Sequence, residues 1–140
     1  MTYKLLIVDD SEDDRMLLKR SLGKILSCEV VASLPDGQAA IDYLQGINGY
    51  EDRQRFPVPD VMLLDFKMPR ASGLDVLAWL KEQSFTDLRV IIASNSFKEG
   101  DIEKSLQLGA RYCFVKGESS EDARVIEGFL RNSGEEADSH

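Results

Sequence analysis

Four short apolar runs, each followed at once by polar residues, constrain the fold more than any other feature of the sequence. The runs span residues 5–8, 61–64, 90–93 and 113–115. The polar residues that follow them are Asp9-Asp10, Asp65, Ser94 and Lys116. Runs of this length, bounded by polar residues, are typical of strands buried on both faces of a parallel sheet. Because parallel strands end at one sheet edge, where open α/β sheets bind ligands, we expect these side chains to converge there.

Helical patterns alternate with the apolar runs, which is the arrangement of βαβ units. We expect strands over residues 4–8, 29–33, 61–65, 90–93 and 112–115. We expect helices over residues 12–26, 37–44, 73–83, 100–108 and 121–130. Right-handed crossovers and one reversal of direction then give the strand order 2-1-3-4-5. The predicted fold class is therefore α/β: a doubly wound, five-stranded parallel sheet of the flavodoxin-like type, with helices on both faces.

A single domain is expected over residues 1–132, because the alternation runs through them without an internal repeat or a second unit. Residues 133–140 are polar and acidic, and we expect them to form a disordered tail. No output domain is expected in this sequence. The long polar connection from Gly46 to Pro59 is either a tolerated surface insertion, which we favour, or a partner-binding loop.

Composition and charge narrow the classes of partner. A net charge of -8 argues against nucleic acid and against anionic membrane surfaces, because both are bound by clustered Lys and Arg. No apolar stretch approaches the ~20 residues that span a bilayer, and the first residues do not form a signal peptide, so we expect a cytoplasmic protein. Cys28 and Cys113 are expected to be free core residues. The single histidine, His140, leaves none for a catalytic triad or a zinc site.

The predicted sheet edge combines carboxylates, a hydroxyl and an ammonium group. Asp9, Asp10 and Asp65 would repel one another unless a cation neutralised them, and an all-oxygen site suits Mg²⁺. A carboxylate beside such a metal can attack phosphorus. Lys116 could then neutralise one phosphoryl oxygen, and Ser94 could donate a hydrogen bond to another.

Each of these residues also has a simpler explanation. The pair Asp9-Asp10 can begin a loop and cap a helix, and Asp65 can end a strand. Ser94 can cap a helix or its preceding loop, and Lys116 can be the solvated end of a strand. Because four such coincidences at one sheet edge are improbable, we favour a joint site.

The sequence resembles the receiver domain of two-component response regulators over residues 4–130. The resemblance is carried by Val8-Asp9-Asp10, by Leu64-Asp65 with Met68-Pro69 and Ser72-Gly73, by Ser94, by Leu108-Gly109-Ala110 and by Lys116. The insertion before the third strand, together with the pattern Asp101-Ile102-x-Lys104-Ser105-x-x-Leu108-Gly109-Ala110, is most similar to single-domain regulators that work with bacterial phytochrome kinases.

The resemblance implies that Asp65 accepts a phosphoryl group from the phosphohistidine of a sensor histidine kinase or a phosphotransfer protein. It also implies a Mg²⁺ site. In that site Asp10 and Asp65 would ligate the ion directly, Asp9 would act through water, and the main-chain carbonyl of Lys67 would complete the protein ligands.

Signalling is implied by the same resemblance. Ser94 and Lys116 would contact the phosphoryl group, and movement of the serine hydroxyl would reshape the face formed by the fourth helix, fifth strand and fifth helix. Such a chain is a signalling module rather than an enzyme, because it turns over no free metabolite. It would act on a downstream protein that the sequence does not name, and the same face could form a homodimer.

Two departures from the family lie after and before the active-site lysine. Gly117 follows Lys116, where most receivers have a proline in a cis peptide. Because a non-proline cis bond costs ~2.5–4 kcal/mol, we expect a trans peptide and a rearranged loop. Cys113 stands where an aromatic residue is usual, and Tyr112 is expected on the other side of the strand, so the aromatic switch is absent or replaced.

A third departure concerns the lifetime of the phosphorylated state. Asn95 is larger than the usual Ala or Gly after the serine, and Lys67 lies two residues past the acceptor. Our hypothesis is that both slow hydrolysis of the aspartyl phosphate by hindering the in-line approach of water.

Two other functions are considered. A receiver-like interaction module that works without phosphorylation is suggested by Gly117 and Cys113. A Mg²⁺ phosphohydrolase with an aspartyl nucleophile is disfavoured, because such enzymes need Asp-x-Asp after the first strand and this chain has Asp9-Asp10-Ser11.

Overall fold

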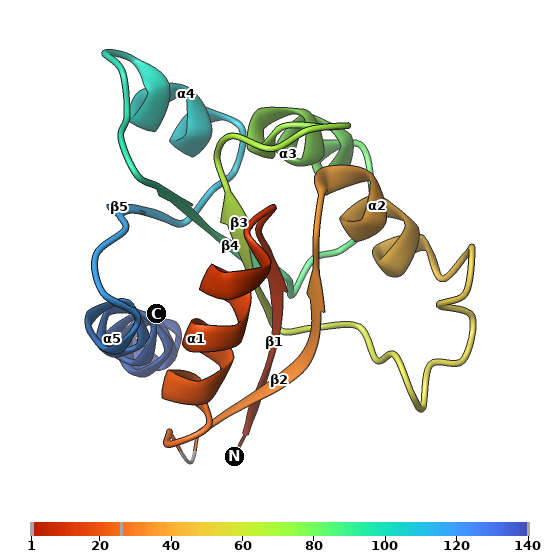
Figure 1. The fold of residues 1–140 in the computed structure, drawn as a ribbon, viewed down its shortest axis with the longest axis horizontal. Helices are drawn as coiled ribbons and strands as arrows, with labels where there is room; N and C mark the ends of the chain where they lie inside the picture. Colours follow the sequence, from red (N-terminus) through yellow and green to blue (C-terminus); the bar gives the residue numbers. More distant parts are fainter. Residues whose placement is uncertain (1, 26, 140) are drawn as a thin grey trace.

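The computed structural model describes residues 2–25 and 27–139, in which strands and helices alternate throughout (Figure 1). The strands are β1 (Tyr3–Val8), β2 (Cys28–Leu34), β3 (Val61–Asp65), β4 (Arg89–Ser94) and β5 (Tyr112–Val115). The helices are α1 (Glu12–Leu22), α2 (Gly37–Gln45), α3 (Gly73–Lys81), α4 (Asp101–Gln107) and α5 (Ser119–Ser139).

All five strands pair in parallel in one sheet, in the order β2-β1-β3-β4-β5. The predicted α/β class and its flavodoxin-like strand order are therefore confirmed. The register also aligns the strand ends. Asp65 at the end of β3 pairs with Ala93 in β4, and the next residue, Ser94, pairs with Val115 at the end of β5. The polar residues that follow the apolar runs consequently lie along one sheet edge.

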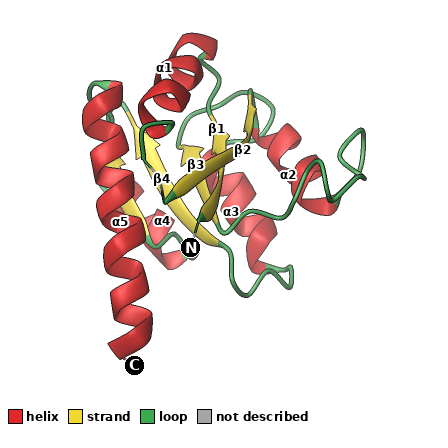
Figure 2. Cartoon of the chain, turned by 90° about the horizontal axis from the view of Figure 1, so that it is seen from below, coloured by secondary structure: helices red, strands yellow, loops and turns green. Residues whose placement is uncertain are grey.

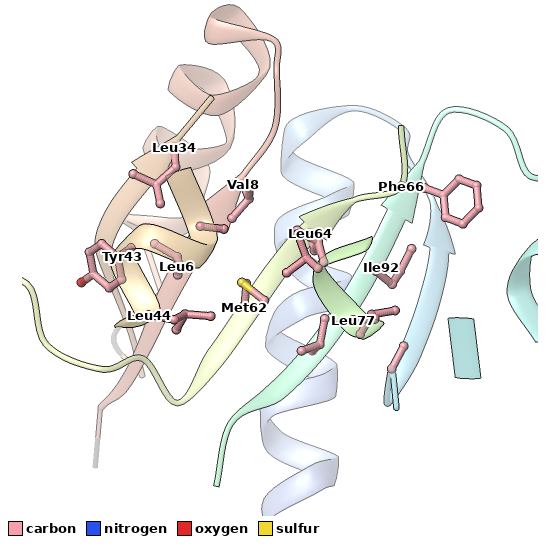
Figure 3. Packing of buried hydrophobic residues seen from close by; sticks show 14 residues of the cluster. Leu6, Val8, Leu34, Tyr43, Leu44, Met62, Leu64, Phe66, Leu77 and Ile92 are labelled. Carbon is pink, nitrogen blue, oxygen red and sulfur yellow. The ribbon is translucent and has the colours of Figure 1, made fainter. Parts of the chain in front are cut away.

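Helices cover both faces of the sheet, which explains why the strands are continuously apolar. α1 and α5 pack side by side on one face, and α2, α3 and α4 lie on the other (Figures 1 and 2). The buried strand residues of the α1/α5 core are Leu5, Ile7, Val61, Leu63, Ile91, Ala93 and Phe114. Those of the opposite core are Leu6, Val8, Leu34, Met62, Leu64, Val90 and Ile92, and Figure 3 labels all of them except Val90. Alternate residues of each strand therefore serve two separate cores.

Helix starts are predicted more accurately than helix ends. α1, α2 and α3 begin directly after Ser11, Asp36 and Ser72, whose side-chain oxygens accept a backbone N–H of the first turn. The end of α1 lies at Leu22 rather than at residue 26, because Gly23 ends the helix there. A polar cap is visible in a sequence, whereas a helix end depends on how the chain packs afterwards.

α5 is longer than the sequence predicts. The prediction of a helix end near Leu130 is wrong, because the helix continues to Ser139 (Figure 2). The added residues contain no proline that would stop the helix, so it continues from first turns that pack on the domain. The predicted disordered tail covers residues 133–140. The side chains of these residues lie outside the described part of the chain, so disorder of the tail stays a prediction.

The long connection over residues 46–59 folds back on α2. The Arg53 guanidinium donates hydrogen bonds to the main-chain carbonyls of Tyr43 (2.8 Å), Leu44 (2.7 Å) and Phe56 (3.1 Å). Two of these carbonyls lie in the last turn of α2, where the carbonyls lack the N–H four residues ahead that the helix interior supplies. The rings of Tyr43 and Phe56 also meet edge to face, with centroids 6.0 Å apart. The insertion is therefore fixed to the domain by its own contacts.

Two predictions made from composition can be compared with the structure. Cys28 and Cys113 are free thiols, as expected, but both are half-buried and pack against the cores rather than lying fully inside them. Burial raises the pKa of the Cys28 thiol to about 11, so this side chain is protonated at neutral pH. Within the described ranges, none of the helices combines the length and apolar character needed to cross a membrane.

Candidate functional site

Three carboxylates meet at the sheet edge where β1 and β3 end. Asp9 and Asp10 follow β1, and Asp65 is the last residue of β3. One carboxylate oxygen from each lies within 4.8 Å of the other two. Asp9 and Asp65 are buried, whereas Asp10 is exposed. The structure therefore brings together the three acids predicted as metal ligands, in an arrangement that can hold a single cation.

Local contacts fix Asp9 at the end of β1. Its N–H donates to the carbonyl of Leu34 in β2 at 3.0 Å, and its carbonyl accepts a hydrogen bond from Arg15 Nη1 at 2.7 Å. Asp9 Oδ1 accepts the N–H of Ser11 at 2.9 Å, while Oδ2 contacts the lysine described below. Because Ser11 is also the N-cap of α1, the start of the helix and the orientation of this carboxylate are set together.

Asp65 is positioned by a close approach between β3 and α3. A Cβ atom on Gly73, the first residue of α3, would lie 2.8 Å from the Asp65 carbonyl oxygen, so glycine is required there. The Gly73 N–H donates to the carbonyl of Phe66 at 3.0 Å, and the Phe66 N–H donates to Ala93 in β4 at 2.8 Å. Lys67 lies in the same turn and is exposed. Ligation of a metal by its carbonyl stays a prediction.

Lys116 joins two of the carboxylates across the pocket. It follows β5, and its Nζ lies 2.8 Å from Asp9 Oδ2 and 3.3 Å from Asp65 Oδ2. The three side chains are only 11%, 12% and 8% exposed, so these ion pairs are largely shielded from solvent. With Asp10, the site holds three carboxylates and one ammonium group, which leaves an excess of negative charge that a divalent cation would neutralise.

The buried charges shift the pKa values of Asp65 and Lys116. Burial, with smaller contributions from Asp9 and Asp10, raises the pKa of Asp65 to about 6 despite the opposing effect of Lys116. Burial lowers the pKa of Lys116, but its contacts with Asp9 and Asp65 outweigh burial, so this pKa lies above its ordinary value. Lys116 is therefore a cation at neutral pH, and a bound metal would favour the ionised form of Asp65.

The hydroxyl of Ser94 is engaged by its own loop. The side chain is buried at the end of β4, where Oγ donates to the carbonyl of Ser96 at 2.7 Å and accepts its N–H at 3.3 Å. Phe97, the residue after Ser96 in this loop, packs on Phe66 with ring centroids 5.6 Å apart. Contact between Ser94 and a phosphoryl group therefore requires the bond to the Ser96 carbonyl to break.

A cavity of about 390 Å³ adjoins the charged groups. Asp65 and Lys116 are among its polar lining residues, and Leu17, Leu18 and Phe114 are among its apolar ones. The exposed residue after Ser94, Asn95, also lines it, and whether it crowds the acceptor stays a prediction. The cavity is large enough to admit a phosphoryl group beside Asp65.

Sequence reasoning missed the contact that holds the segment after Lys116. The described part of the chain contains no cis peptide bond, so the Lys116–Gly117 peptide is trans, as expected. The Gly117 N–H donates to Asp122 Oδ1 at 2.9 Å, and Asp122 is itself buried. Burial raises the pKa of Asp122, and the hydrogen bond from Gly117 and the charge of Lys116 oppose this rise. The sequence feature that could have indicated this contact is the acidic residue Asp122 in the first turn of a predicted helix.

Cys113 and Tyr112 lie on opposite faces of β5, as predicted. Cys113 packs on the core beneath α4, where burial raises the pKa of its thiol and a hydrogen bond with Ser105 opposes the rise. Tyr112 is 44% exposed and stacks on Phe114 and Phe129, with centroids 6.4 and 6.2 Å away. The Tyr112 ring therefore faces α5 and cannot replace an aromatic side chain at position 113.

Comparison with known proteins identifies a family match along most of the chain. The response regulator receiver domain family model matches residues 5–126. This range includes all of the acids at the sheet edge as well as Ser94 and Lys116.

The chain is similar both to a part of much longer proteins and to proteins of nearly its own length. The protein-glutamate methylesterase/protein-glutamine glutaminase of group 2 operon from Bradyrhizobium diazoefficiens is 35% identical over 90% of this chain, which spans only 30% of that protein. Response regulator Rcp1 from Synechocystis sp. is 29% identical, over 89% of this chain and 84% of Rcp1. The solved structure of the phosphorylated cyanobacterial phytochrome response regulator RcpA is 28% identical, with a TM-score of 0.79 over 92% of this chain and 91% of RcpA.

Proposed function

The chain belongs to the response regulator receiver family, and from this premise we propose that Asp65 accepts a phosphoryl group with the help of Mg²⁺. The observation that carries the proposal is the buried contact of Lys116 with Asp9 and Asp65, beside the exposed carboxylate of Asp10. It supplies an acceptor oxygen, a fixed positive charge and a set of oxygen ligands at one place.

The residues present fit a Mg²⁺ ion. Asp10 and Asp65 would ligate it directly, and Asp9 would bind it through water. The main-chain carbonyl oxygen of Lys67 would be a further ligand. Bound Mg²⁺ would neutralise the carboxylates and attract phosphoryl oxygens, as the excess negative charge of the pocket requires.

In the proposed reaction, an Asp65 carboxylate oxygen attacks the phosphorus atom of a phosphohistidine. An oxygen–phosphorus bond forms, the phosphorus–nitrogen bond breaks, and the electron pair leaves with the imidazole. Lys116 neutralises charge on one phosphoryl oxygen, and Ser94 donates to another after releasing the Ser96 carbonyl. The chain thus transforms only itself and is a signalling module rather than an enzyme of free substrates.

The proposed phosphodonor is a sensor histidine kinase or a phosphotransfer protein. Similarity to RcpA, a cyanobacterial phytochrome response regulator, supports a phytochrome-type pathway. We propose the cytoplasm as its location. The output would be contact with a downstream protein, for which the sequence gives no name. Exposed apolar side chains on α4 and β5, namely Ile102, Leu106, Tyr112 and Val115, support a homodimer through the α4–β5–α5 face. No role in binding nucleic acid or membranes is proposed.

A phosphodonor assay tests this function. The full chain is incubated with Mg²⁺ and phosphoramidate, and its intact mass is measured before and after treatment with hydroxylamine, which cleaves acyl phosphates. We expect one hydroxylamine-sensitive phosphoryl group in the wild type and in the control Asp87→Asn, which changes an exposed acid. We expect no mass gain in Asp65→Asn. A gain that survives Asp65→Asn would contradict the assignment of the acceptor.

A second function is kept because specific observations favour it. A module that acts without phosphorylation would explain why Cys113 replaces an aromatic residue, and why the Ser94 hydroxyl is already bonded to Ser96. Absence of any mass gain in the wild type, with phosphoramidate and with a histidine kinase, would favour this alternative.

A further inference from the structure

Lys116 needs an anchor on each side if its ammonium group is to stay between two carboxylates. On the strand side, its N–H donates to the carbonyl of Ser94 at 2.8 Å, which is the last bond between β4 and β5. Beyond this point the chain leaves the sheet. A long lysine side chain loses considerable rotamer entropy when it is held in one place, so a loose backbone would spread its ammonium group over many positions.

The second anchor is the carboxylate of Asp122. Its Oδ1 accepts the N–H of Gly117, the residue directly after Lys116, at 2.9 Å. The bond is charge-assisted, and the acceptor is only 9% exposed, so water competes little for it. It also depends on the residue at position 117, because a proline there would have no N–H to donate.

Asp122 stands on a rigid support. It lies in the first turn of α5, and its own N–H donates to the carbonyl of Glu118 at 2.9 Å. The next buried residues, Ala123 and Ile126, pack in the core that α5 shares with α1 (Figure 2). The hydroxyl of Ser119 also lies 3.1 Å from that of Ser21 in α1. The carboxylate is therefore fixed by the helix pair rather than by a mobile loop.

We propose that Asp122 is a positioning residue for phosphoryl transfer: by binding the Gly117 N–H, its carboxylate holds Lys116 so that the ammonium group meets Asp65. This inference rests on the proposed phosphoacceptor function. Asp122 acts through the backbone and does not touch the phosphoryl group. Its loss leaves the acceptor and the metal ligands in place but lets the lysine move.

Three variants test the role of Asp122. Asp122→Ala removes the acceptor, and Asp122→Asn keeps an oxygen that can accept the Gly117 N–H. The control Glu121→Ala removes the same charge from the neighbouring residue, which is exposed. Phosphorylation by phosphoramidate is timed at several donor concentrations, with saturating Mg²⁺ and at a temperature where all variants are folded.

We expect Asp122→Ala to lower the maximal rate about 10- to 100-fold, since small misplacements of a catalytic group have effects of this size. The donor concentration at half-maximal rate should change little. Asp122→Asn should recover most of the rate, and Glu121→Ala should match the wild type. A wild-type rate in Asp122→Ala, or equal losses in Asp122→Ala and Glu121→Ala, would overturn the inference.

A second measurement does not depend on phosphorylation. The NMR signal of the Lys116 ε-carbon reports the surroundings of the ammonium group in the metal-free chain. We expect this signal to shift in Asp122→Ala and to return in Asp122→Asn. An unshifted signal overturns the positioning role even if no donor phosphorylates the chain. Failure of the wild type to gain phosphate contradicts the proposed function instead.

Discussion

The acidic pocket and the region that would transmit its state lie at the same sheet edge, but they are built differently. The acidic pocket consists of Asp9, Asp10, Asp65 and Lys116. Charged groups hold it together, with Lys116 Nζ 2.8 and 3.3 Å from two carboxylates. The transmission region consists of Ser94, Ser96, Phe97 and Cys113. Its contacts are the hydrogen bond of the Ser94 hydroxyl to Ser96 and the packing of the Phe97 ring on Phe66, and the Cys113 thiol is half-buried.

The difference shows how strictly each kind of contact restricts sequence. A charge can neutralise another in a buried site only if it is close and correctly placed, so few residue types can serve in the acidic pocket. Packing has many solutions of similar energy, so an aromatic ring lost at position 113 can be replaced elsewhere. In this chain, Phe97 on Phe66 is the ring contact that spans the β4–α4 and β3–α3 loops.

The largest effect is expected for Lys116→Met, which keeps the length of the side chain and removes its charge. Phosphorylation of Asp65 should slow by ~100-fold or more, because a phosphoryl oxygen loses its fixed positive partner. Without Mg²⁺, the free energy of unfolding should fall by about 3 kcal/mol, since two buried carboxylates lose their partner. Intact mass and urea denaturation measure the two quantities.

The control for this substitution is Lys104→Met, on the exposed surface of α4. It should leave both quantities close to the wild type. Mg²⁺ should stabilise Lys116→Met more than the wild type, because the ion then neutralises the carboxylates alone. Equal stability of Lys116→Met and the wild type in EDTA would show that charge does not hold the acidic pocket together.

The next largest effect is a pH dependence of the free energy of unfolding, which we expect from the titration of Asp65. Its pKa is about 6 in the folded chain and 3.8 ordinarily, so between these values the folded state binds more protons than the unfolded state. Stability contributed by the protonated carboxyl should therefore be lost as the pH rises from about 4 to about 6, by at most about 3 kcal/mol.

Urea denaturation in EDTA at about pH 4.5 and about pH 7 measures this dependence. The difference between the two should be smaller in Asp65→Asn than in the wild type, and Asp65→Asn should be the more stable protein near pH 7. Asp87→Asn, which changes an exposed acid, should follow the wild type. Parallel pH curves for Asp65→Asn and the wild type would contradict the raised pKa.

Much of the fold and of the acidic pocket could be predicted because both follow from local patterns. Continuous apolar runs indicate strands buried on both faces, and parallel strands must end at one edge. The convergence of Asp9, Asp65 and Lys116 then needs no knowledge of the packing. Helix starts were predictable for the same reason, since Ser11 and Ser72 are polar caps next to the helices that they begin.

Contacts that depend on the three-dimensional path of a loop could not be predicted. The bond from Gly117 to Asp122 and the hydroxyl contact between Ser94 and Ser96 require exact backbone positions. The packing of Phe97 on Phe66 joins loops far apart in the sequence, and no periodicity marks such a pair. The extension of α5 beyond Leu130 was not predicted, because the helical spacing of apolar residues ends there.

A smaller effect is expected for Phe97→Ala in the transmission region. Loss of the ring contact with Phe66 should lower the free energy of unfolding by about 1 kcal/mol. Phosphorylation of Asp65 should keep its rate, whereas the NMR shift changes that phosphorylation causes in α4 and β5 should become smaller. The control Phe85→Ala, which loses a similar contact with Trp79, should be destabilised but should keep those shift changes. Undiminished changes in Phe97→Ala would exclude this ring pair as the replacement for an aromatic residue at position 113.

The smallest effect is expected for Asn95→Ala, at the boundary between the acidic pocket and the transmission region. Asn95 lines the cavity beside Asp65, where its side chain can hinder the in-line approach of water to the phosphoryl group. Its removal should shorten the lifetime of the aspartyl phosphate about threefold, which corresponds to ~0.7 kcal/mol in the barrier. Timed loss of phosphate after removal of the donor measures this, with Asn132→Ala on α5 as the control. An unchanged lifetime would mean that water reaches Asp65 by a path that Asn95 does not restrict, and would leave the exposed Lys67 as the other candidate barrier.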